Sequence, residues 1–220
     1  SVYQAAFDRA GIVRVNEISD IFDCTALLAR RKLPRGGRLA IVTNAGGPGV
    51  MATDSLLARN GELAEISDST REQLNAFLPS AWSHGNPIDI LGDADPERLA
   101  KTMEIVQADP NVDAILVVFS PQAMSQPTAA AQAVVEVSKK TTKPILTSWM
   151  GGKATHEGET LFNAAKIPTY RAPEEAVKAF MYLVSFVRTH DVLYETPRDI
   201  PVGFTLERSP HRRHSNLPRA

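Results

Sequence analysis

Residues 38–61 read Arg-Leu-Ala-Ile-Val-Thr-Asn-Ala-Gly-Gly-Pro-Gly-Val-Met-Ala-Thr-Asp-Ser-Leu-Leu-Ala-Arg-Asn-Gly. The apolar run at 39–42, with Ile41 and Val42, is typical of a buried parallel strand. Residues 44–49 hold three glycines and a proline, so we expect a sharp turn there. Pro48 suits the first position of a helix predicted over 49–60, because its missing N–H would have no acceptor there. The segment therefore predicts a strand, a glycine loop and a helix.

The glycine loop has two readings. It exposes backbone N–H groups at a helix start, which suits a phosphate or another anion. It can equally serve only a tight turn and close packing of helix on strand. The spacing of Gly46, Gly47 and Gly49 fits neither the dinucleotide fingerprint nor the P-loop, so a nicotinamide or ATP site in this loop is disfavoured.

Composition describes an ordinary globular protein. The 220 residues are 43% hydrophobic and 22% charged, with a net charge of −1, which gives no general reason to bind nucleic acid or an anionic membrane. No apolar stretch approaches the roughly 20 residues that span a bilayer. The single cysteine, Cys24, fits a reducing compartment, so we expect a cytoplasmic protein. Ser1 follows no signal-peptide pattern and is expected to be a cut point within a longer polypeptide.

Beyond residue 38, strand-like and helix-like segments alternate. This alternation predicts an α/β fold in which a parallel sheet lies between two layers of helices. We expect a helical segment over 1–37, the α/β domain over 38–190, and an extended or disordered tail over 191–220. Strands are predicted at 39–43, 62–66, 113–120, 145–149 and 168–170, and helices at 49–60, from 68, at 96–108, 128–140 and 154–165, and from 173.

Loops at the strand ends carry the candidate site residues. The carboxyl ends of parallel strands meet at one edge of a sheet, where ligands bind. That edge should bring the glycine loop together with further polar and aromatic residues. The candidates are Asn86, Asp89, Ser120, Gln122, Trp149 and Gly151. These loops contain no nucleophile–base pair and no metal-ligand spacing, so neither a catalytic residue nor a metal site is expected. For Asp89 and Trp149, structural roles in a turn and in packing remain open.

Six short motifs make the chain recognisable. They lie at 2–7, 10–15, 40–50, 86–89, 120–124 and 148–152. Through them the chain resembles the NDP-forming acyl-CoA synthetases, the ADP-forming acetyl-CoA synthetase group related to succinyl-CoA synthetase. The likeness is greatest to the large bacterial forms often fused to a GNAT acetyltransferase.

The resemblance implies a flavodoxin-like, doubly wound ligase-CoA domain like the C-terminal domain of the succinyl-CoA synthetase β subunit. Such enzymes join an acid to CoA at the expense of ATP, with Mg as the accompanying ion, through an acyl phosphate and a phosphohistidine. The glycine loop, as Asn44, Ala45, Gly46, Gly47, Gly49 and Val50, would then hold the phosphate.

The resemblance also implies partners within the same enzyme. The phosphohistidine is expected in a Ser-His-Thr-Gly-like segment upstream of residue 2. A CoA-binding domain and, beyond the tail, an ATP-grasp domain are expected as further parts of the enzyme. The isolated fragment should then be inactive and bind no cofactor tightly. Two alternatives stay open: a flavodoxin-like module that binds FMN, a nucleotide or another small molecule without catalysis, and a structural assembly module.

Overall fold

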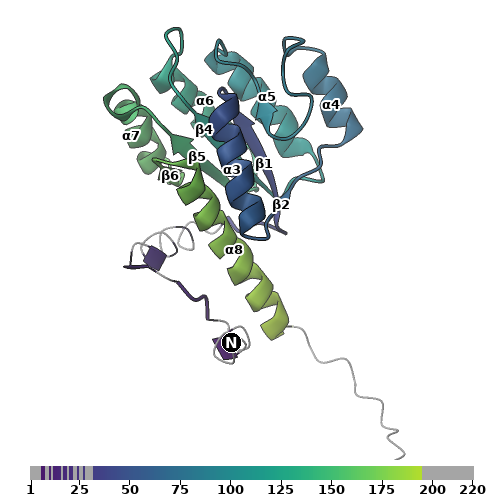
Figure 1. Ribbon diagram of the computed structural model, residues 1–220, viewed down its shortest axis with the longest axis vertical. Helices are drawn as coiled ribbons and strands as arrows, with labels where there is room; N and C mark the ends of the chain where they lie inside the picture. The colour runs from purple at the N-terminus through teal and green to yellow at the C-terminus, as the bar shows by residue number, and fades with distance from the viewer. Residues whose placement is uncertain are drawn as a thin grey trace, which may run out of the picture.

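The computed structural model describes residues 32–194 without interruption and, before them, residues 6, 7, 10, 12–15, 17, 18, 20, 21, 24 and 27. Most of the helical segment expected over 1–37, and nearly all of the tail expected over 191–220, lie outside the described residues. The predicted alternation of strands and helices is confirmed (Figure 1). The elements are β1 (Arg38–Thr43), α3 (Gly46–Ala58), β2 (Glu62–Leu63), α4 (Asp68–Asn75), β3 (Ile88–Asp89), α5 (Pro96–Ala108), β4 (Ala114–Phe119), α6 (Pro127–Lys139), β5 (Ile145–Trp149), the 3₁₀ helix η1 (Gly152–Thr155), α7 (His156–Ala164), β6 (Thr169–Tyr170) and α8 (Pro173–Tyr194).

The sheet is parallel throughout its described strands. Its order is β2-β1-β4-β5-β6, and β3 pairs with β1. With the two-residue β3 set aside, the strands follow the order 2-1-3-4-5 that defines flavodoxin-like sheets. The predicted fold class is confirmed.

Helices cover both faces of the sheet. Alternate strand residues point to opposite sides. Val42 and Val117 lie in a core formed with α4, α5, α6 and α7, and Ile41 and Leu116 lie in a second core formed with α3 and α8. Figure 1 shows α3 and α8 side by side across one face. The architecture is the expected three-layer αβα arrangement.

Helix α3 starts earlier than predicted, at Gly46 rather than at residue 49. Pro48 is consequently its third residue, not its first. Proline is tolerated there because no N–H of the first turn has an intrahelical acceptor. The first helical bond runs from the Gly49 N–H to the Ala45 carbonyl at 3.3 Å.

Other boundaries differ modestly from the predictions. β2 has two residues rather than five, and η1 precedes α7 where a single helix was expected. β3 was not predicted, because two residues after Pro87 are too short to show alternation. Helix α8 continues to Tyr194, beyond the domain end expected at residue 190.

Two short strands and one side chain supply the hydrogen-bond partners along the outer edge of β1. β2 pairs with the first two residues of β1 and β3 with the last two. Between them lies the side chain of Asn86. Its Oδ1 accepts from the Ile41 N–H at 2.9 Å, and its Nδ2 donates to the carbonyls of Leu39 and Ala64, both at 2.9 Å. The amide thus takes the place of a missing stretch of strand.

Asp113 joins the start of β1 to the start of β4. Its carboxylate accepts from the Arg38 backbone N–H at 3.1 Å, and from Nε and Nη2 of the same arginine, each at 2.9 Å. The hydrogen bonds and charge of Arg38 hold the pKa of Asp113 below its usual value, against the opposing effect of burial.

We expect Asn86→Ala to lower the free energy of unfolding by about 3 kcal/mol, because three backbone groups beside a buried strand lose their partner. Urea unfolding would measure the loss. Asn163→Ala, which removes an exposed amide from α7, is the control and should stay near the wild-type value. Equal stability of the two variants would contradict the role assigned to Asn86.

The lowered pKa of Asp113 gives a pH dependence of defined sign. Its contribution to stability is fully present above about pH 4, the unfolded pKa of an aspartate, and is lost as the pH falls through the lower folded value. Asp113→Asn should lose stability at neutral pH and show a shallower decline on acidification. Unfolding midpoints between pH 2 and 7 test this, with the exposed Asp54→Asn as control. A wild-type decline retained in full by Asp113→Asn would refute it.

Candidate functional site

The glycine loop lies where β1 passes into α3. The Thr43 hydroxyl accepts from the Ala45 N–H at 3.0 Å and donates to the Ala45 carbonyl at 2.9 Å, which fixes Ala45 in an extended conformation before the helix. Gly46 and Gly47 follow and are exposed. Within the described part of the chain, no side chain caps this helix start.

Two amide hydrogens remain available at this helix start. The N–H groups of Gly46 and Gly47 have no acceptor among the described residues, whereas Ala45 and Gly49 bond within the loop and the helix. Pro48 has no N–H. Of the six residues predicted to hold a phosphate, therefore, two present unpaired donors, and they do so at the positive end of a 13-residue helix. Phosphate binding by the loop stays a prediction.

The three glycines have different surroundings. A Cβ on Gly49 would lie 2.9 Å from Cγ2 of the buried Thr43, so close packing of α3 on β1 requires this glycine. A Cβ on Gly46 would lie 3.0 Å from Oδ2 of Asp89. A Cβ on Gly47 would meet nothing within 4 Å, so nothing in the described fold requires a glycine there.

Asn44 and Ser120 connect the ends of β1 and β4. The Asn44 side chain, 4% exposed, donates through Nδ2 to the Ser120 carbonyl at 2.8 Å and accepts through Oδ1 from the Ser120 N–H at 2.9 Å. These bonds span the point where the strand order reverses, which is the usual ligand crevice of this fold. The Asn44 amide therefore holds the two loops together.

Asp89 and Gln122 lie beside these loops. Oδ1 of Asp89 accepts from the Leu91 N–H at 2.9 Å, which supports the turn role left open for this carboxylate. Oδ2 is the atom that lies near Gly46. Gln122 is exposed, and its backbone N–H donates to the Ser125 hydroxyl at 2.7 Å. The edge thus brings Gly46, Asp89 and Ser120 together, with Gln122 at the rim.

Two predicted site residues have their groups engaged elsewhere. The Asn86 amide is committed to the backbone bonds described above, so it supports the sheet. Trp149 is 1% exposed and stacks on Phe119 with ring centroids 4.3 Å apart, while Phe162 meets it edge-on at 4.8 Å. Its ring faces are covered, so Trp149 packs the core and offers no platform for a ligand.

A cleft of about 740 Å³ opens beyond the end of β5. Two predicted site residues border it, Gly151 and the edge of the otherwise buried Trp149. The charged or titratable residues of its lining are Lys153, His156, Glu159 and Arg171. His156 is exposed and lies 3.7 Å from the Glu159 carboxylate. Sequence inspection missed Lys153 and Arg171, because single exposed cations in loops carry no motif. Their grouping arises only when β5 and β6 lie side by side.

A small cavity lies beside the carboxyl end of β4, next to the point where the strand order reverses. Its lining residues, among them Asn44, Ile90 and Phe119, enclose only about 10 Å³. Small-molecule sites usually occupy about 300–1,000 Å³. This cavity is therefore too small for a flavin or a nucleotide.

The described residues show neither a candidate metal cluster nor a candidate membrane span. They contain no group of three or more histidine, cysteine, aspartate or glutamate side chains that could hold a metal ion. They also contain no helix long and apolar enough to cross a bilayer.

Comparison with known proteins identifies the family. The sequence model of the ligase-CoA domain matches residues 39–188. The chain belongs to this family. It is 36% identical over 181 residues to an ADP-forming acetate–CoA ligase I of Archaeoglobus fulgidus, covering 82% of the chain and 25% of that protein.

A second relative and a solved structure carry names of the same class of enzyme. The ligase-CoA domain is 35% identical over 188 residues to the alpha subunit of ADP-forming acetate–CoA ligase II of Pyrococcus furiosus, covering 83% of this chain and 41% of that subunit. It superposes with a TM-score of 0.81, at 30% identity, on acetyl-coenzyme A synthetase 1 of Candidatus Korarchaeum cryptofilum in complex with phosphate and ADP, covering 87% and 42% of the two chains. The chain thus spans about a quarter to two fifths of the length of these relatives.

The glycines of this ligase-CoA domain provide a matched pair of tests. Gly49→Ala should lower the free energy of unfolding by about 1–3 kcal/mol, because the stiff Thr43 side chain has to shift. Gly47→Ala should be neutral or stabilise by up to about 1 kcal/mol through better helix propensity. Thermal or urea unfolding of both variants would decide. If Gly47→Ala were the more damaging change, the close contact assigned to Gly49 would be wrong.

Proposed function

We propose that this ligase-CoA domain is part of an ADP-forming acid–CoA ligase and that the start of α3 stabilises the phosphate of a phosphohistidine or acyl phosphate. Family membership and the identity to ADP-forming acetate–CoA ligases support the reaction class. Because the chain spans a minority of those proteins, the domain works with other parts of such an enzyme. These are the CoA-binding, phosphohistidine-bearing and ATP-grasp domains, which supply CoA and ATP with Mg. The domain alone is inactive and holds none of these cofactors tightly.

The observation that carries the proposal is the pair of unpaired amides at Gly46 and Gly47. Both lie at the end of α3 that bears about half a positive charge. Hydrogen bonds from N–H groups to an anion are about twice as strong as bonds between neutral groups. Donors fixed before the reaction need no reorganisation when charge develops on the phosphoryl group. The loop can therefore stabilise a phosphate without a charged side chain.

The carboxylate of Asp89 determines the side from which a phosphate approaches the start of α3. Its Oδ2 lies on the Gly46 side of the helix start, and a second negative charge there repels a phosphate. Around Gly47, the space that a Cβ would take is empty. The phosphate therefore enters over Gly47. A side chain at this position blocks the entry and leaves the fold intact.

The remaining candidate residues divide by location. Asp89 lies beside Gly46, and Ser120 and Gln122 follow β4, whose end Asn44 ties to the glycine loop. Ser120 and Gln122 face the acid that receives the phosphoryl group. Gly151 belongs to the cleft beyond β5, whose cations favour a negatively charged part of a substrate.

A cytoplasmic location is also part of the proposal. The sequence contains a single cysteine, Cys24, and a chain with one cysteine suits a reducing compartment.

Titration of the 220-residue chain with inorganic phosphate, followed through amide chemical shifts, tests the site. The Gly46 and Gly47 resonances should move in the wild type. In Gly47→Val the dissociation constant should rise about tenfold or more, because the methyl groups occupy the place of the phosphate. Ala58→Val, at the exposed far end of the same helix, should bind like the wild type.

The reaction itself needs a full-length enzyme that carries this domain. There, Gly47→Val should abolish transfer of the labelled γ-phosphate of ATP to the protein, while Ala58→Val retains it. Wild-type amides that ignore phosphate, or transfer undiminished in Gly47→Val, would overturn the proposal.

A further inference from the structure

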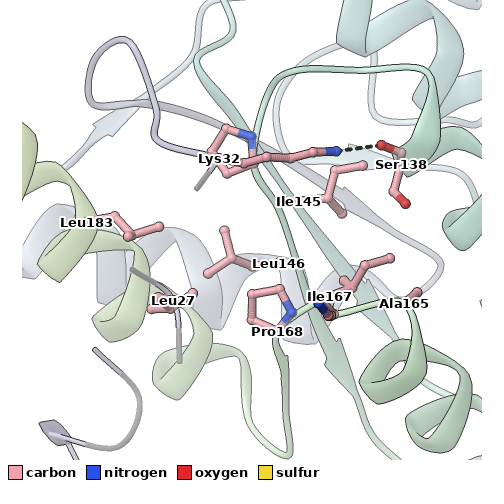
Figure 2. Close-up of a pocket in the computed structure, with 11 residues that line it drawn as sticks. Leu27, Lys32, Ser138, Ile145, Leu146, Ala165, Ile167, Pro168 and Leu183 are labelled. Atoms are coloured by element: carbon pink, nitrogen blue, oxygen red, sulfur yellow. Dashed lines mark hydrogen bonds between the residues drawn. The ribbon is translucent and has the colours of Figure 1, made fainter. Parts of the chain in front are cut away.

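A second cavity lies at the opposite edge of the sheet, where β5 begins. Its volume is about 210 Å³ (Figure 2). Pro144 and Ile145 bring the chain into β5 here, whereas the glycine loop and Gly151 follow strands at their carboxyl ends. The cavity is therefore separate from the proposed phosphate site.

Side chains from four separate segments form an apolar lining. Figure 2 shows Leu27, Leu146, Pro168 and Leu183 near one another, with Ile145 and Ile167 also in the lining. Leu27 and Leu183 are buried, at 3% and 2% exposure. Leu27 therefore packs with Leu146 of β5 and Leu183 of α8.

An anchored ammonium group lies on the polar side of this cavity. Nζ of Lys32 donates to the carbonyls of Ser138 at 2.7 Å and Thr141 at 2.9 Å. An ammonium has three N–H donors, so one remains for a ligand. The two carbonyl bonds hold the head group in place, which reduces the entropy lost when a ligand binds.

Lys166 is a second cation in the lining. It has a φ of +58°, in the left-handed region that favours glycine. The conformation closes α7, because the Ile167 N–H returns to the Phe162 carbonyl at 2.8 Å. The backbone thus fixes where the Lys166 side chain begins.

The charge around the cavity is positive on balance. No aspartate or glutamate is among its described lining residues, and neither Lys32 nor Lys166 forms an ion pair with a described residue. The ends of α6 and α7 lie nearby, and each contributes about half a negative charge. Two ammonium groups exceed that sum by about one unit charge.

We propose that this cavity binds a small monocarboxylate with a compact apolar body, of the size of benzoate. A dry apolar cavity of about 150 Å³ accommodates benzene, so 210 Å³ leaves room for a ring and a carboxylate. The apolar lining takes the ring, and the free N–H of Lys32 takes the carboxylate, with Lys166 adding charge. The ligand lies between β5 and the side chains of Leu27 and Lys32.

Sodium benzoate is the probe, and benzamide is its neutral counterpart of the same shape. In the 220-residue chain, benzoate should shift the methyl resonances of Ile145, Leu146 and Ile167 and leave the Gly46 and Gly47 amides in place. Benzamide should bind about tenfold more weakly or worse, because it lacks the charge-assisted bond.

Lys32→Met keeps most of the aliphatic stem and removes the charge. It should weaken benzoate about tenfold and leave benzamide unchanged. Lys139→Met is the control, because this lysine lies next to Ser138 but outside the lining, and it should bind both probes like the wild type. Circular dichroism confirms that each variant is folded.

Three results would overturn the assignment: methyl groups unmoved by benzoate, equal affinity for benzoate and benzamide, or equal benzoate affinity in Lys32→Met and the wild type. None of them bears on phosphate binding at Gly46 and Gly47, so the two proposals fail separately.

Discussion

The hydrogen bonds that complete the outer edge of β1 support the rest of this structure. β1 is buried and lies where the strand order reverses, so each of its backbone groups needs a partner. β2 and β3 are too short to supply them along the whole edge, and the Asn86 amide fills the interval. A side chain suits this place, because a longer β2 would run past the point where β3 must bring Asp89 to the sheet edge.

The need for hydrogen-bond partners also determines which N–H groups stay unpaired at the start of α3. The Thr43 hydroxyl bonds to the N–H and carbonyl of Ala45, and the Asn44 amide bonds to the N–H and carbonyl of Ser120. The Gly49 N–H donates to the Ala45 carbonyl. The exposed donors of Gly46 and Gly47 remain unpaired among the described residues. Gly49 permits α3 to lie against β1, whereas Gly47 has no contact that requires a glycine. This difference separates a glycine that the fold needs, Gly49, from one that the proposed phosphate site would explain, Gly47.

Much of this fold could be predicted, because strands and helices have local periods. The strand at 145–149 and the helix at 96–108 coincide with the structure, since apolar runs and a proline at a helix start are local signals. Asn86 could not be assigned in this way, because its partners include backbone groups more than 40 residues away. An asparagine before a proline in a polar loop suggests a ligand contact as readily as a structural one.

Trp149 shows the same limit at the site. Its position at a strand end allowed exposure, and its burial follows from the register that places Phe119 beside it on β4 and from Phe162 above it on α7. The cations of the cleft beyond β5 are also brought together only by strand pairing. Sequence reasoning therefore locates the edge where a site forms, and tertiary contacts decide which side chains on it are free.

The two edges of the sheet favour anions by different means. Every helix that follows a strand here begins at the carboxyl edge and ends at the amino edge, so backbone dipoles make the first positive and the second negative. At the carboxyl edge, the phosphate site that we propose rests on two unpaired amides, with Asp89 as an acidic neighbour that would limit where a phosphate enters. At the amino edge the dipoles oppose an anion, and lysines must first offset the helix ends. Lys32 offsets the negative end of α6 directly, because its Nζ donates to carbonyls at and just beyond the end of this helix. The third N–H of the ammonium is not used by a described residue.

The two proposed anion sites therefore differ in what they depend on. The site at the amino edge depends on side-chain charge, whereas the site at α3 depends on backbone geometry. We therefore expect substitution of Lys32 to affect only the site at the amino edge. Addition of a side chain at Gly47 should affect only the site at α3.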